Sequence, residues 1–600
     1  MHTPRSTSAL SPDLVTLSQQ HLESGNIEAA EAVARTQLKR QPKDMAASYL
    51  LGLALSRMGQ LDAAAFFLRG PAQMEPAQRD CQCEYGRVLF DIGKYQQGIE
   101  YLRRATQTDP TSAYAWEQLC RALLRAGMFV DAVNAGEQAV QLDSANTKAM
   151  TAIGTAWAAL GASDEAARWY GKAVKATPHR IEAASAWAYF LNYIDAKPDD
   201  LAMAHKRCGA AANAAVVFDV AMPEREARNG GPLRIGFLSP DFRDHPVARF
   251  MLPLLRNIDR EKFDVYLYHL HPTRDAVSRE CGALAKTWRV VGHLPLPQLA
   301  QTIATDQLDV LVDLAGWTGN TGIAAMALRL APLQASYLGY PSNTGIDEID
   351  IRLVDAVTDP EVAGYRGNGG GTGPAINEAP RRLPGCFVCW APPRNAPPVK
   401  QRTPDAPITF GSFNYIGKLS ARCLKTWGRM LAGVPNSRLL IKGKGLDDAR
   451  NAAVLSGILA RNGIDHSRVQ LRGTIASYTA HLAAYNDIDI ALDPFPYNGT
   501  TTTCEALWMG VPVLTLAGTM HAGRVGASLL TAVGLGDAWV CETEDTYVAM
   551  ATAFARDKAA LALLRNSLRG RVAGSMLCDG AGFARRFERT VLEMKTALRA

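Results

Sequence analysis

Five glycines spaced 34 residues apart constrain the fold of the first third of the chain more than any other feature. They are Gly25, Gly59, Gly93, Gly127 and Gly161. A small residue follows each glycine after five positions, at Ala30, Ala64, Gly98, Ala132 and Ala166. Twelve positions later come Pro42, Pro76, Pro110, Ser144 and Pro178. These three tracks predict one helix–turn–helix per repeat: the glycine permits a tight turn, the small residue lets two helices approach, and the proline ends the second helix.

A 34-residue period is that of the tetratricopeptide (TPR) repeat, which residues 11–214 resemble. Residues 181–214 lack the glycine and resemble a sixth, degenerate or capping repeat. Stacked TPR units form a superhelix whose concave face holds a peptide or protein partner. The alternative is a purely structural stalk or an element for homo-oligomerisation.

Composition narrows the class of protein. Six hundred residues are too many for one core, so two to four domains are expected. The 48% hydrophobic and 20% charged residues describe a globular chain, and a net charge of +6 gives no argument for nucleic acid. No apolar run approaches 20 residues and residues 1–13 lack the apolar core of a signal peptide, so we expect no membrane span and a cytoplasmic location.

Cysteine spacing gives no reason to expect a metal. Among eleven cysteines only Cys386 and Cys389 form a C-x-x-C pair, and no second pair stands at zinc-ligand spacing. We expect reduced thiols and no metal site.

Two α/β lobes are predicted after a linker at 215–231. Short apolar strands alternate with helices in a first lobe, 232–395, and in a second, 405–600, which favours parallel doubly wound sheets. The predicted strands are 233–239, 263–268, 308–314, 335–340, 408–414, 438–441, 469–471, 488–492 and 511–516. The Gly/Pro-rich stretch 367–399 predicts a loop and an inter-lobe linker, and an amphipathic final helix from about 580 to 600 is expected to pack back across the lobes.

Several common enzyme motifs are missing. The sequence contains no G-x-G-x-x-G in dinucleotide context and no G-x-x-x-x-G-K-[ST], which argues against a dehydrogenase and a P-loop NTPase. It also contains no H-E-x-x-H and no G-x-S-x-G. Two lobes in sequence instead predict a cleft at the carboxyl ends of their strands.

The stretch 488–516 is the strongest candidate for part of a binding site. A buried strand is followed by a Pro/Gly turn, the threonines 500–503 and a helix that ends before Gly510 and Pro512. The unpaired first-turn amides and the positive end of the helix dipole suit a phosphate there. The alternative is that a threonine merely caps the helix.

Four further residues stand where they could face the cleft. His245 follows the first strand of the first lobe and has a pKa range suited to a general base, although it could equally cap the next helix. Lys418 follows the first strand of the second lobe and could meet a diphosphate; the alternative is an exposed loop lysine. His481 lies on a helix before the strand 488–492, and Glu505 lies one turn after the threonines.

Five motifs together resemble one family, the TPR-containing protein O-GlcNAc transferases and their SPINDLY relatives. They are DFRDHP (241–246), DLAGWTG (313–319), LAPLQASYLGYPSNTG (330–345), SFNYIGK (412–418) and the stretch 488–516. The resemblance implies an α + α/β chain in which a TPR solenoid precedes two Rossmann-like lobes of the GT-B type. It also implies a nucleotide-sugar donor and no metal.

The resemblance also implies roles for single residues. His245 matches a catalytic base or substrate-positioning group, and Lys418 matches the lysine that stabilises the leaving diphosphate. The remaining matches are Ala476, Tyr478 and His481 near the nucleotide base, Tyr415 in the nucleotide site, Thr500, Thr501 and Thr502 on the diphosphate, Glu505 on the ribose, and Gly339, Tyr340 and Pro341 in the loop near the donor sugar.

The implied activity is an inverting transfer of N-acetylglucosamine from UDP-GlcNAc to a serine or threonine hydroxyl of a protein held by the TPR groove. Thr500, Glu505 and Tyr415 depart from the animal enzymes, and the stretch around Thr500 is closer to the SPINDLY branch, whose plant member uses GDP-fucose. Fucosyl transfer and flagellin-type glycosylation are therefore alternative activities. A TPR scaffold with an inactive sugar-nucleotide module is the non-enzymatic alternative.

Overall fold

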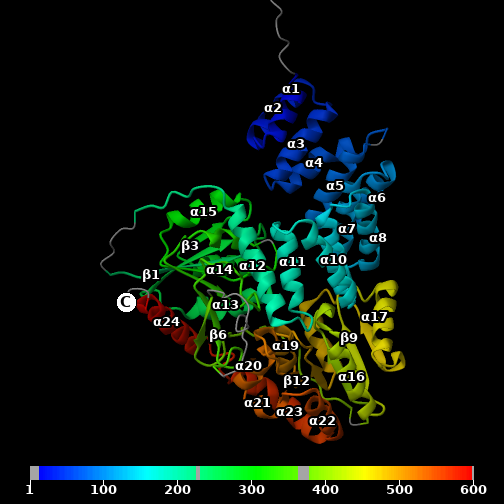
Figure 1. Ribbon diagram of the computed structural model, residues 1–600, viewed down its shortest axis with the longest axis vertical. Helices are drawn as coiled ribbons and strands as arrows, with labels where there is room; N and C mark the ends of the chain where they lie inside the picture. The colour runs from blue at the N-terminus through cyan, green and yellow to red at the C-terminus, as the bar shows by residue number, and fades with distance from the viewer. Residues whose placement is uncertain are drawn as a thin grey trace, which may run out of the picture. The chain divides into compact units, whose positions relative to one another are not determined.

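The computed structural model describes residues 13–76, 78–224, 230–319, 321–361, 378–403 and 405–597 (Figure 1). The chain divides into two compact units, residues 1–156 and 157–600. Within the described ranges no helix combines the length and the apolar character that a membrane span requires.

The first unit consists of helical pairs with the predicted 34-residue period. Its helices are α1 (Leu14–Glu23), α2 (Ile27–Arg40), α3 (Met45–Arg57), α4 (Leu61–Ala72), α5 (Arg79–Asp91), α6 (Tyr95–Thr108), α7 (Ala113–Ala126), α8 (Phe129–Leu142) and most of α9 (Thr147–Ala159). The glycine track lies at the turns with φ between 75° and 85°, a region that favours glycine. The small-residue track is buried: a Cβ on Gly98 would lie 2.7 Å from the Gly86 carbonyl oxygen. The predicted TPR architecture is confirmed.

The second unit begins with the last turn of α9 and contains three further helices before the lobes. These are α10 (Ser163–Ala176), α11 (Ile181–Leu191) and α12 (Pro198–Ala215). Apolar residues of α11 and α12, among them Ala188 and Cys208, share a hydrophobic cluster with Leu311 and Trp317 of the first lobe. The pair predicted as a sixth repeat therefore packs directly on that lobe.

The first lobe is a seven-stranded parallel sheet in the order β3-β2-β1-β4-β5-β6-β7. Its strands are β1 (Leu233–Ser239), β2 (Phe263–His269), β3 (Thr287–Val290), β4 (Val310–Asp313), β5 (Leu333–Tyr337), β6 (Ile351–Asp355) and β7 (Ala379–Leu383). One face packs on α13 (Pro246–Asn257), α14 (Ala276–Leu284) and the C-terminal helix. The other face packs on α15 (Leu296–Thr305), the 3₁₀ turn η1 (Ile323–Ala327), α11 and α12.

The second lobe is a six-stranded parallel sheet in the order β10-β9-β8-β11-β12-β13. Its strands are β8 (Thr409–Ser412), β9 (Arg438–Lys442), β10 (Val469–Arg472), β11 (Ile490–Leu492), β12 (Val513–Leu516) and β13 (Val540–Cys541). Its helices are α16 (Ala421–Gly433), α17 (Ala449–Arg461), α18 (Tyr478–Ala483), α19 (Thr501–Trp508), α20 (Val525–Ala532), α21 (Gly536–Trp539), α22 (Glu544–Arg556) and α23 (Lys558–Ala573). The 3₁₀ turns are η3 (Ile416–Lys418), η4 (His466–Arg468), η5 (Ala484–Asp487) and η6 (His521–Gly523).

Both lobes share one topology. Numbered within its own lobe, each sheet contains the order 3-2-1-4-5-6, which is the doubly wound Rossmann order. The strand order reverses between β1 and β4 in the first lobe, where Ile235 pairs with Val310, and between β8 and β11 in the second, where Phe410 pairs with Ile490. Ligands of such sheets bind outside the carboxyl ends of the strands at these reversal points.

The strand predictions are confirmed for the principal strands, with some corrections. Residues 379–383 form β7, so the prediction of loop and linker throughout 367–399 is wrong there, while residues 367–377 lie outside the described ranges. The predicted strand 335–340 ends at Tyr337, because Leu338 has φ 46° and turns the chain. β3, β6 and β13 are additional; β3 and β13 are short, and all three lie toward the sheet edges.

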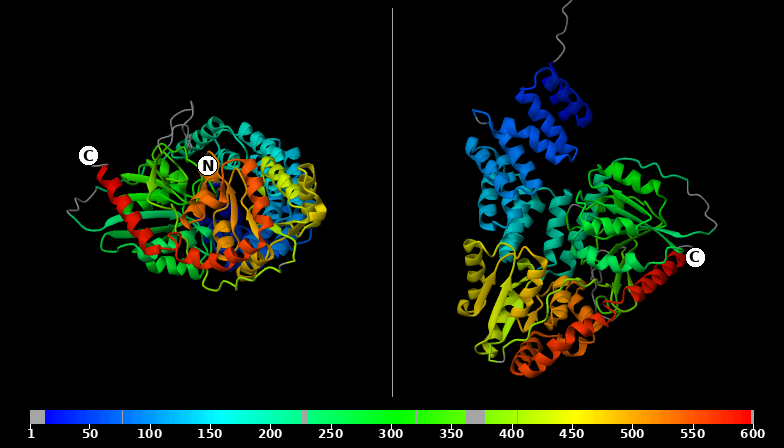
Figure 2. Two further views of the ribbon diagram at one scale, coloured as in Figure 1. Left: turned by 90° about the horizontal axis from the view of Figure 1, so that it is seen from below. Right: turned by 180° about the vertical axis from the view of Figure 1, so that it is seen from behind.

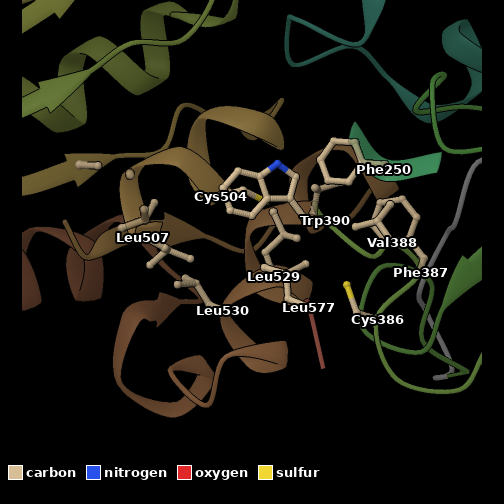
Figure 3. Packing of buried hydrophobic residues seen from close by; sticks show 14 of the residues in the cluster. Phe250, Cys386, Phe387, Val388, Trp390, Cys504, Leu507, Leu529, Leu530 and Leu577 are labelled. Atoms are coloured by element: carbon tan, nitrogen blue, oxygen red, sulfur yellow. The ribbon is translucent and has the colours of Figure 1, made fainter. Parts of the chain in front are cut away.

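One large hydrophobic cluster joins the two lobes. Figure 3 shows part of it, including Phe250 of α13, Trp390 of the connecting segment and Leu529 of α20. Cys386 is buried in the same cluster, and all eleven cysteines are free of disulfides. The final helix α24 (Gly580–Ala597), red in Figures 1 and 2, packs along α13 and β7 of the first lobe, as predicted.

Candidate functional site

Lys418 lies at the reversal point of the second sheet, in the turn η3 that follows β8. Its ammonium nitrogen donates to the carbonyl oxygen of Asn498 at 2.7 Å and lies 3.9 Å from the ring centroid of Tyr497. Burial lowers the pKa of Lys418 to about 7, and the nearby Asp493 carboxylate opposes that shift. The side chain is therefore held between the two reversal-point strands rather than exposed in a loop.

Asp493 organises the turn that follows β11. Its carboxylate accepts from the Gly499 amide at 2.5 Å and from the Thr515 hydroxyl at 2.7 Å, and burial raises its pKa to about 7. The Asn498 side chain closes the same turn by donating to the Pro494 carbonyl at 2.9 Å. The turn that leads to the threonines is thus fixed from inside.

The threonines surround the N-terminus of α19. Thr500 occupies the N-cap position, but its side chain makes no capping hydrogen bond. The Thr502 hydroxyl donates to the side-chain oxygen of Asn414 at 2.8 Å, and the Thr503 hydroxyl donates to the Gly499 carbonyl at 3.2 Å. Thr500 and Thr501 are half-buried. The sequence alternative, that a threonine merely caps the helix, is thus not met by Thr500, the residue at the N-cap position.

Glu505 is buried beside α18 and accepts three hydrogen bonds. The donors are Tyr478 at 2.9 Å, the Nε2 of His481 at 3.0 Å and Tyr485 at 3.3 Å. Because Nε2 donates, Nδ1 of His481 faces the other way, and this buried atom has no partner in the described part of the chain. Ala476 is exposed just before α18.

His245 is the N-cap residue of α13, directly after the loop that follows β1. Its Nδ1 accepts from the Val247 amide at 3.3 Å and lies 3.5 Å from a carboxylate oxygen of Asp241. Burial lowers its pKa, against the raising effect of Asp241. The capping alternative is therefore correct, and a neutral His245 in this geometry carries its proton on Nε2.

One contact joins the His245 helix to the Glu505 network. The guanidinium carbon of Arg249, one turn after His245 on α13, lies 3.8 Å from the ring centroid of Tyr478. The carboxyl edge of the first sheet thus meets α18 of the second lobe. His245 and His481 consequently belong to neighbouring elements.

The loop 339–345 follows β5 and is largely buried. Tyr340 is 6% exposed; its hydroxyl hydrogen bonds with Nε2 of His205 at 2.7 Å, and its ring stacks on Tyr189 with 5.8 Å between centroids. Pro341 is buried as well, and the Cα of Gly339 faces the Leu314 carbonyl so closely that a Cβ would lie 1.9 Å from that oxygen. The Tyr340 ring therefore packs inward, away from solvent.

Tyr415 lies at the surface beside Lys418. It is 40% exposed, and its ring centroid lies 5.6 Å from that of Tyr193, which follows α11. Tyr193 also contacts Tyr497 at 5.1 Å. The helical segment before the lobes thus contributes an aromatic residue that contacts Tyr497, the ring on which the Lys418 ammonium lies, and no sequence motif indicated it.

Two further buried groups were missed by sequence reasoning. Asp359 of the first lobe accepts from Arg352 at 2.5 Å and from Nδ1 of His521 in the second lobe at 2.6 Å. Asp313, at the end of β4, accepts from the Gly316 amide at 2.5 Å, and burial raises its pKa to about 7. Asp313 stands in the motif DLAGWTG, which was its only signal.

A small hollow at the carboxyl ends of β8 and β11 is lined by Asn414, Asp493 and Thr502, among others. A cavity of about 410 Å³ lies instead at the amino edge of the second sheet, next to Ile408 and Asp489, and contains none of the predicted site residues. Within the described ranges no group of three or more His, Cys, Asp or Glu could hold a metal ion.

Comparisons with known proteins agree with this architecture. A TPR family model matches residues 84–147 and 121–181. In curated sequences, the chain is 39% identical over 366 residues to the probable UDP-N-acetylglucosamine–peptide N-acetylglucosaminyltransferase SPINDLY of Arabidopsis thaliana, covering 59% of this chain and 38% of that protein. It is 38% identical over 434 residues to the rice protein of the same description, covering 70% and 45%. The chain spans less than half the length of these relatives.

A solved structure extends the comparison to the fold. A mutant of the Thermobaculum terrenum O-GlcNAc transferase superimposes with a TM-score of 0.77 at 27% identity, covering 87% of this chain and 99% of that one. The family model for glycosyl transferase family 41 matches residues 208–365 and 398–587, which is more than half of the sequence. The chain, with TPR repeats followed by two Rossmann-like lobes of the GT-B type, belongs to glycosyl transferase family 41.

Proposed function

We propose that this protein is an inverting protein O-glycosyltransferase that moves N-acetylglucosamine from UDP-GlcNAc onto serine or threonine hydroxyls. Family membership and the names of its relatives support a sugar-nucleotide donor and a protein acceptor. The observation that carries the proposal is the position of Lys418 beside the N-terminus of α19, at the reversal point of the second sheet. This is where sheets of this topology bind nucleotides.

The diphosphate of the donor is assigned to Lys418 and to Thr500, Thr501 and Thr502. A helix N-terminus favours a phosphate through its unpaired amides and its dipole. The half-buried Thr500 and Thr501, and a Thr500 hydroxyl that is not used as a helix cap, support donation to phosphate oxygens. Lys418 adds the positive charge that stabilises the leaving diphosphate as its charge develops.

The nucleoside is assigned to the segment from Ala476 to His481, with Tyr415 at the rim and Glu505 behind it. The unpaired Nδ1 of His481 supports this assignment, because a buried ring nitrogen without a partner is costly until a ligand group meets it. In the neutral ring whose Nε2 donates to Glu505, this Nδ1 is a hydrogen-bond acceptor. Uracil N3–H and guanine N1–H are both suitable donors to it.

The acceptor hydroxyl is assigned to the neighbourhood of His245, and the donor sugar to the loop that contains Gly339, Tyr340 and Pro341. The hydroxyl oxygen attacks the anomeric carbon while the bond from that carbon to the diphosphate oxygen breaks and its electron pair leaves with the diphosphate. The hydroxyl proton goes to a water molecule that the Nε2–H of His245 orients, and from there to solvent, because Nδ1 of that ring already accepts from the Val247 amide. Because the hydroxyl attacks the anomeric carbon from the face opposite the leaving diphosphate, this single displacement inverts the anomeric configuration.

The same proposal assigns a role to each domain and names the partners. Residues 11–214 hold the acceptor polypeptide, residues 232–395 contribute His245 and the sugar loop, and residues 405–600 bind the nucleotide. We propose that no metal takes part, because Lys418 and the helix N-terminus carry the charge stabilisation. The same assignment places the protein in the cytoplasm, where nucleotide sugars are available to it, and includes no nucleic-acid or membrane partner.

Thermal shift with UDP, GDP and CMP, followed by donor turnover with UDP-GlcNAc and GDP-fucose, tests the proposal. We expect UDP to raise the melting temperature and UDP-GlcNAc to be turned over with EDTA present. Stabilisation by GDP and turnover of GDP-fucose alone would replace the donor by GDP-fucose, the alternative that the resemblance of the stretch around Thr500 to the SPINDLY branch implies. No response to any nucleotide would leave the inactive scaffold and overturn the proposal.

A further inference from the structure

The loop 339–345 is held by side chains from distant parts of the chain. Its Tyr340 hydroxyl bonds to His205, and its Ser342 hydroxyl donates to the side-chain oxygen of Asn192 at 2.8 Å. On the other side, the Thr344 amide donates to the Glu378 carboxylate at 2.5 Å. The loop is therefore clamped between the α11–α12 segment and Glu378.

Helix α12 reaches the loop at backbone contact. A Cβ on Gly209 would lie 1.7 Å from the carbonyl oxygen of Gly345. A Cβ on Gly345, which has φ 77°, would lie 2.0 Å from the carbonyl oxygen of His205. Both positions therefore require glycine, and the helix and the loop fit each other without intervening side chains.

The hydrogen bonds of His205 determine which of its nitrogens carries the proton. Nδ1 lies 2.7 Å from the Leu201 carbonyl oxygen, which can only accept, so Nδ1 carries the proton. Nε2 then accepts the hydrogen bond from the Tyr340 hydroxyl at 2.7 Å. His205 is 1% exposed, and burial lowers its pKa to about 4, so the neutral ring persists at neutral pH.

The surroundings leave this contact little freedom. Tyr340 is stacked on Tyr189 of α11, and both α12 and the loop contribute to one hydrophobic cluster through Cys208 and Tyr340. Side chains in such packed interiors occupy defined rotamers. Apolar packing thus fixes the Tyr340 ring, and the hydrogen bond to His205 fixes its hydroxyl.

We propose that His205 is a positioning residue for the sugar half of the donor: by holding Tyr340, it keeps the loop 339–345 in the conformation that receives the transferred sugar. This rests on the proposed function. The last helix before the lobes, which the repeat pattern includes in the partner-binding array, then forms part of the donor site. The nucleotide half is unaffected, since Lys418, His481 and α19 all belong to the second lobe.

The test compares full-length variants of this contact with the unaltered protein. H205L removes the acceptor for the Tyr340 hydroxyl, Y340F removes the hydroxyl, and H205Q retains an acceptor oxygen near the position of Nε2. For each, kcat and KM for UDP-GlcNAc turnover, the Ki for UDP and hydrogen exchange of the 339–345 peptide are measured. Y268F, which breaks a buried tyrosine–Asp306 bond of 2.6 Å elsewhere in the first lobe, is the matched control for lost stability.

We expect H205L and Y340F to lower kcat/KM for UDP-GlcNAc about tenfold or more, because small displacements of groups that position substrates have effects of that order. Exchange in the loop should rise, the Ki for UDP should stay within about twofold, and H205Q should recover most of the activity. The double variant H205L/Y340F should be no worse than either single one, since both break the same bond.

Three results would overturn the positioning role. These are unchanged kcat/KM in H205L, equal losses in kcat/KM and UDP affinity, and the same loss of kcat/KM in Y268F. An unaltered protein that turns over no sugar nucleotide overturns the transferase assignment itself. The two failures are distinguishable, since the first requires an active parent protein and the second shows an inactive one.

Discussion

The ammonium nitrogen of Lys418 lies 2.7 Å from the carbonyl oxygen of Asn498, so the turn after β8 and the turn after β11 meet across the reversal point of the second sheet. The Asp493 carboxylate raises the pKa of Lys418, against the lowering effect of burial, and Asp493 is itself buried. Lysine and carboxylate both have pKa values of about 7 here, so the protonation of this pair changes near neutral pH.

Donor binding should take up a proton above pH 7. The free protein holds Lys418 increasingly neutral as the pH rises past about 7, whereas a bound diphosphate favours the charged form. We expect the affinity for UDP-GlcNAc, whose phosphates do not titrate in this range, to fall by up to about tenfold per pH unit above 7. Calorimetry in two buffers with different ionisation enthalpies measures the proton uptake directly.

Substitutions at the same pair provide the controls. K418R keeps its charge throughout the range, so its affinity should be nearly constant from pH 6.5 to 8.5. D493N removes the charge that supports protonation of Lys418 and should move the loss of affinity to lower pH. An unaltered protein whose affinity does not change over this range would contradict the assignment of the diphosphate to Lys418.

Substituting His245 can separate capping from catalysis. H245N retains a side-chain acceptor at the N-cap of α13, whereas H245A does not, so only H245A should lose about 1 kcal/mol of stability. Both should lower the rate of sugar transfer by about a hundredfold or more, because both remove the imidazole that orients the water accepting the hydroxyl proton. Chemical denaturation and transfer assays measure the two effects, and transfer by H245N at the parental rate would remove His245 from the mechanism.

Glu505 should control nucleotide affinity through His481. In the parent protein three donors share the Glu505 carboxylate. E505Q replaces one of its two acceptor oxygens by an NH2 group, which is itself a donor, so the network is disrupted while the side-chain volume stays the same. We expect the affinity for UDP to fall by about tenfold or more, the cost of about one unsatisfied buried group. Isothermal titration measures this, with the neighbouring exposed substitution T479S as control; equal affinity in both variants would exclude the network from the site.

Breaking the buried contact between the lobes at Asp359 should destabilise the protein strongly. D359A leaves the Arg352 guanidinium buried without its carboxylate, which costs about 3–5 kcal/mol. D545A, in a pair with Arg429 whose aspartate is 84% exposed, should cost less than about 1 kcal/mol. Similar unfolding midpoints for the two variants in urea would contradict this account.

The same group predicts a pH dependence. Arg352 and His521 hold the pKa of Asp359 below its usual value near 3.8, against the raising effect of burial. Its stabilising contribution is therefore fully present above that value and is lost as the pH falls below it. Acid unfolding followed by circular dichroism should begin at higher pH in D359N than in the parent protein.

Much of the fold could be predicted from the sequence because its signals are local and periodic. The glycines of the repeats occupy positive φ values, and the strands that flank each reversal point are short segments of mostly buried residues bounded by turns. β7 was missed because its residues, APRRL, are largely polar or conformationally restricted and form an edge strand. Only pairing with β6, which no local pattern reveals, defines it as a strand.

The candidate site could be predicted only in part for a similar reason. Lys418 and the threonines follow strands directly, so topology brings them to one edge of the sheet. His205 and Glu378 hold the loop 339–345 from positions 135 and 38 residues away from Tyr340, and neither stands in a motif. Their partners depend on tertiary packing, which residue spacing does not encode.

The position of α24 has a consequence for synthesis of the protein on the ribosome. Phe587 packs against Phe237 and Tyr337 of the first sheet, and Glu588 accepts from the Asp259 amide at 2.8 Å. The part of that sheet face that α24 covers, beside α13, therefore stays without its helix until the second lobe and residues 583–594 have been translated. Through that interval the apolar residues under α24 are exposed on the nascent first lobe, and surface of this kind is prone to aggregation.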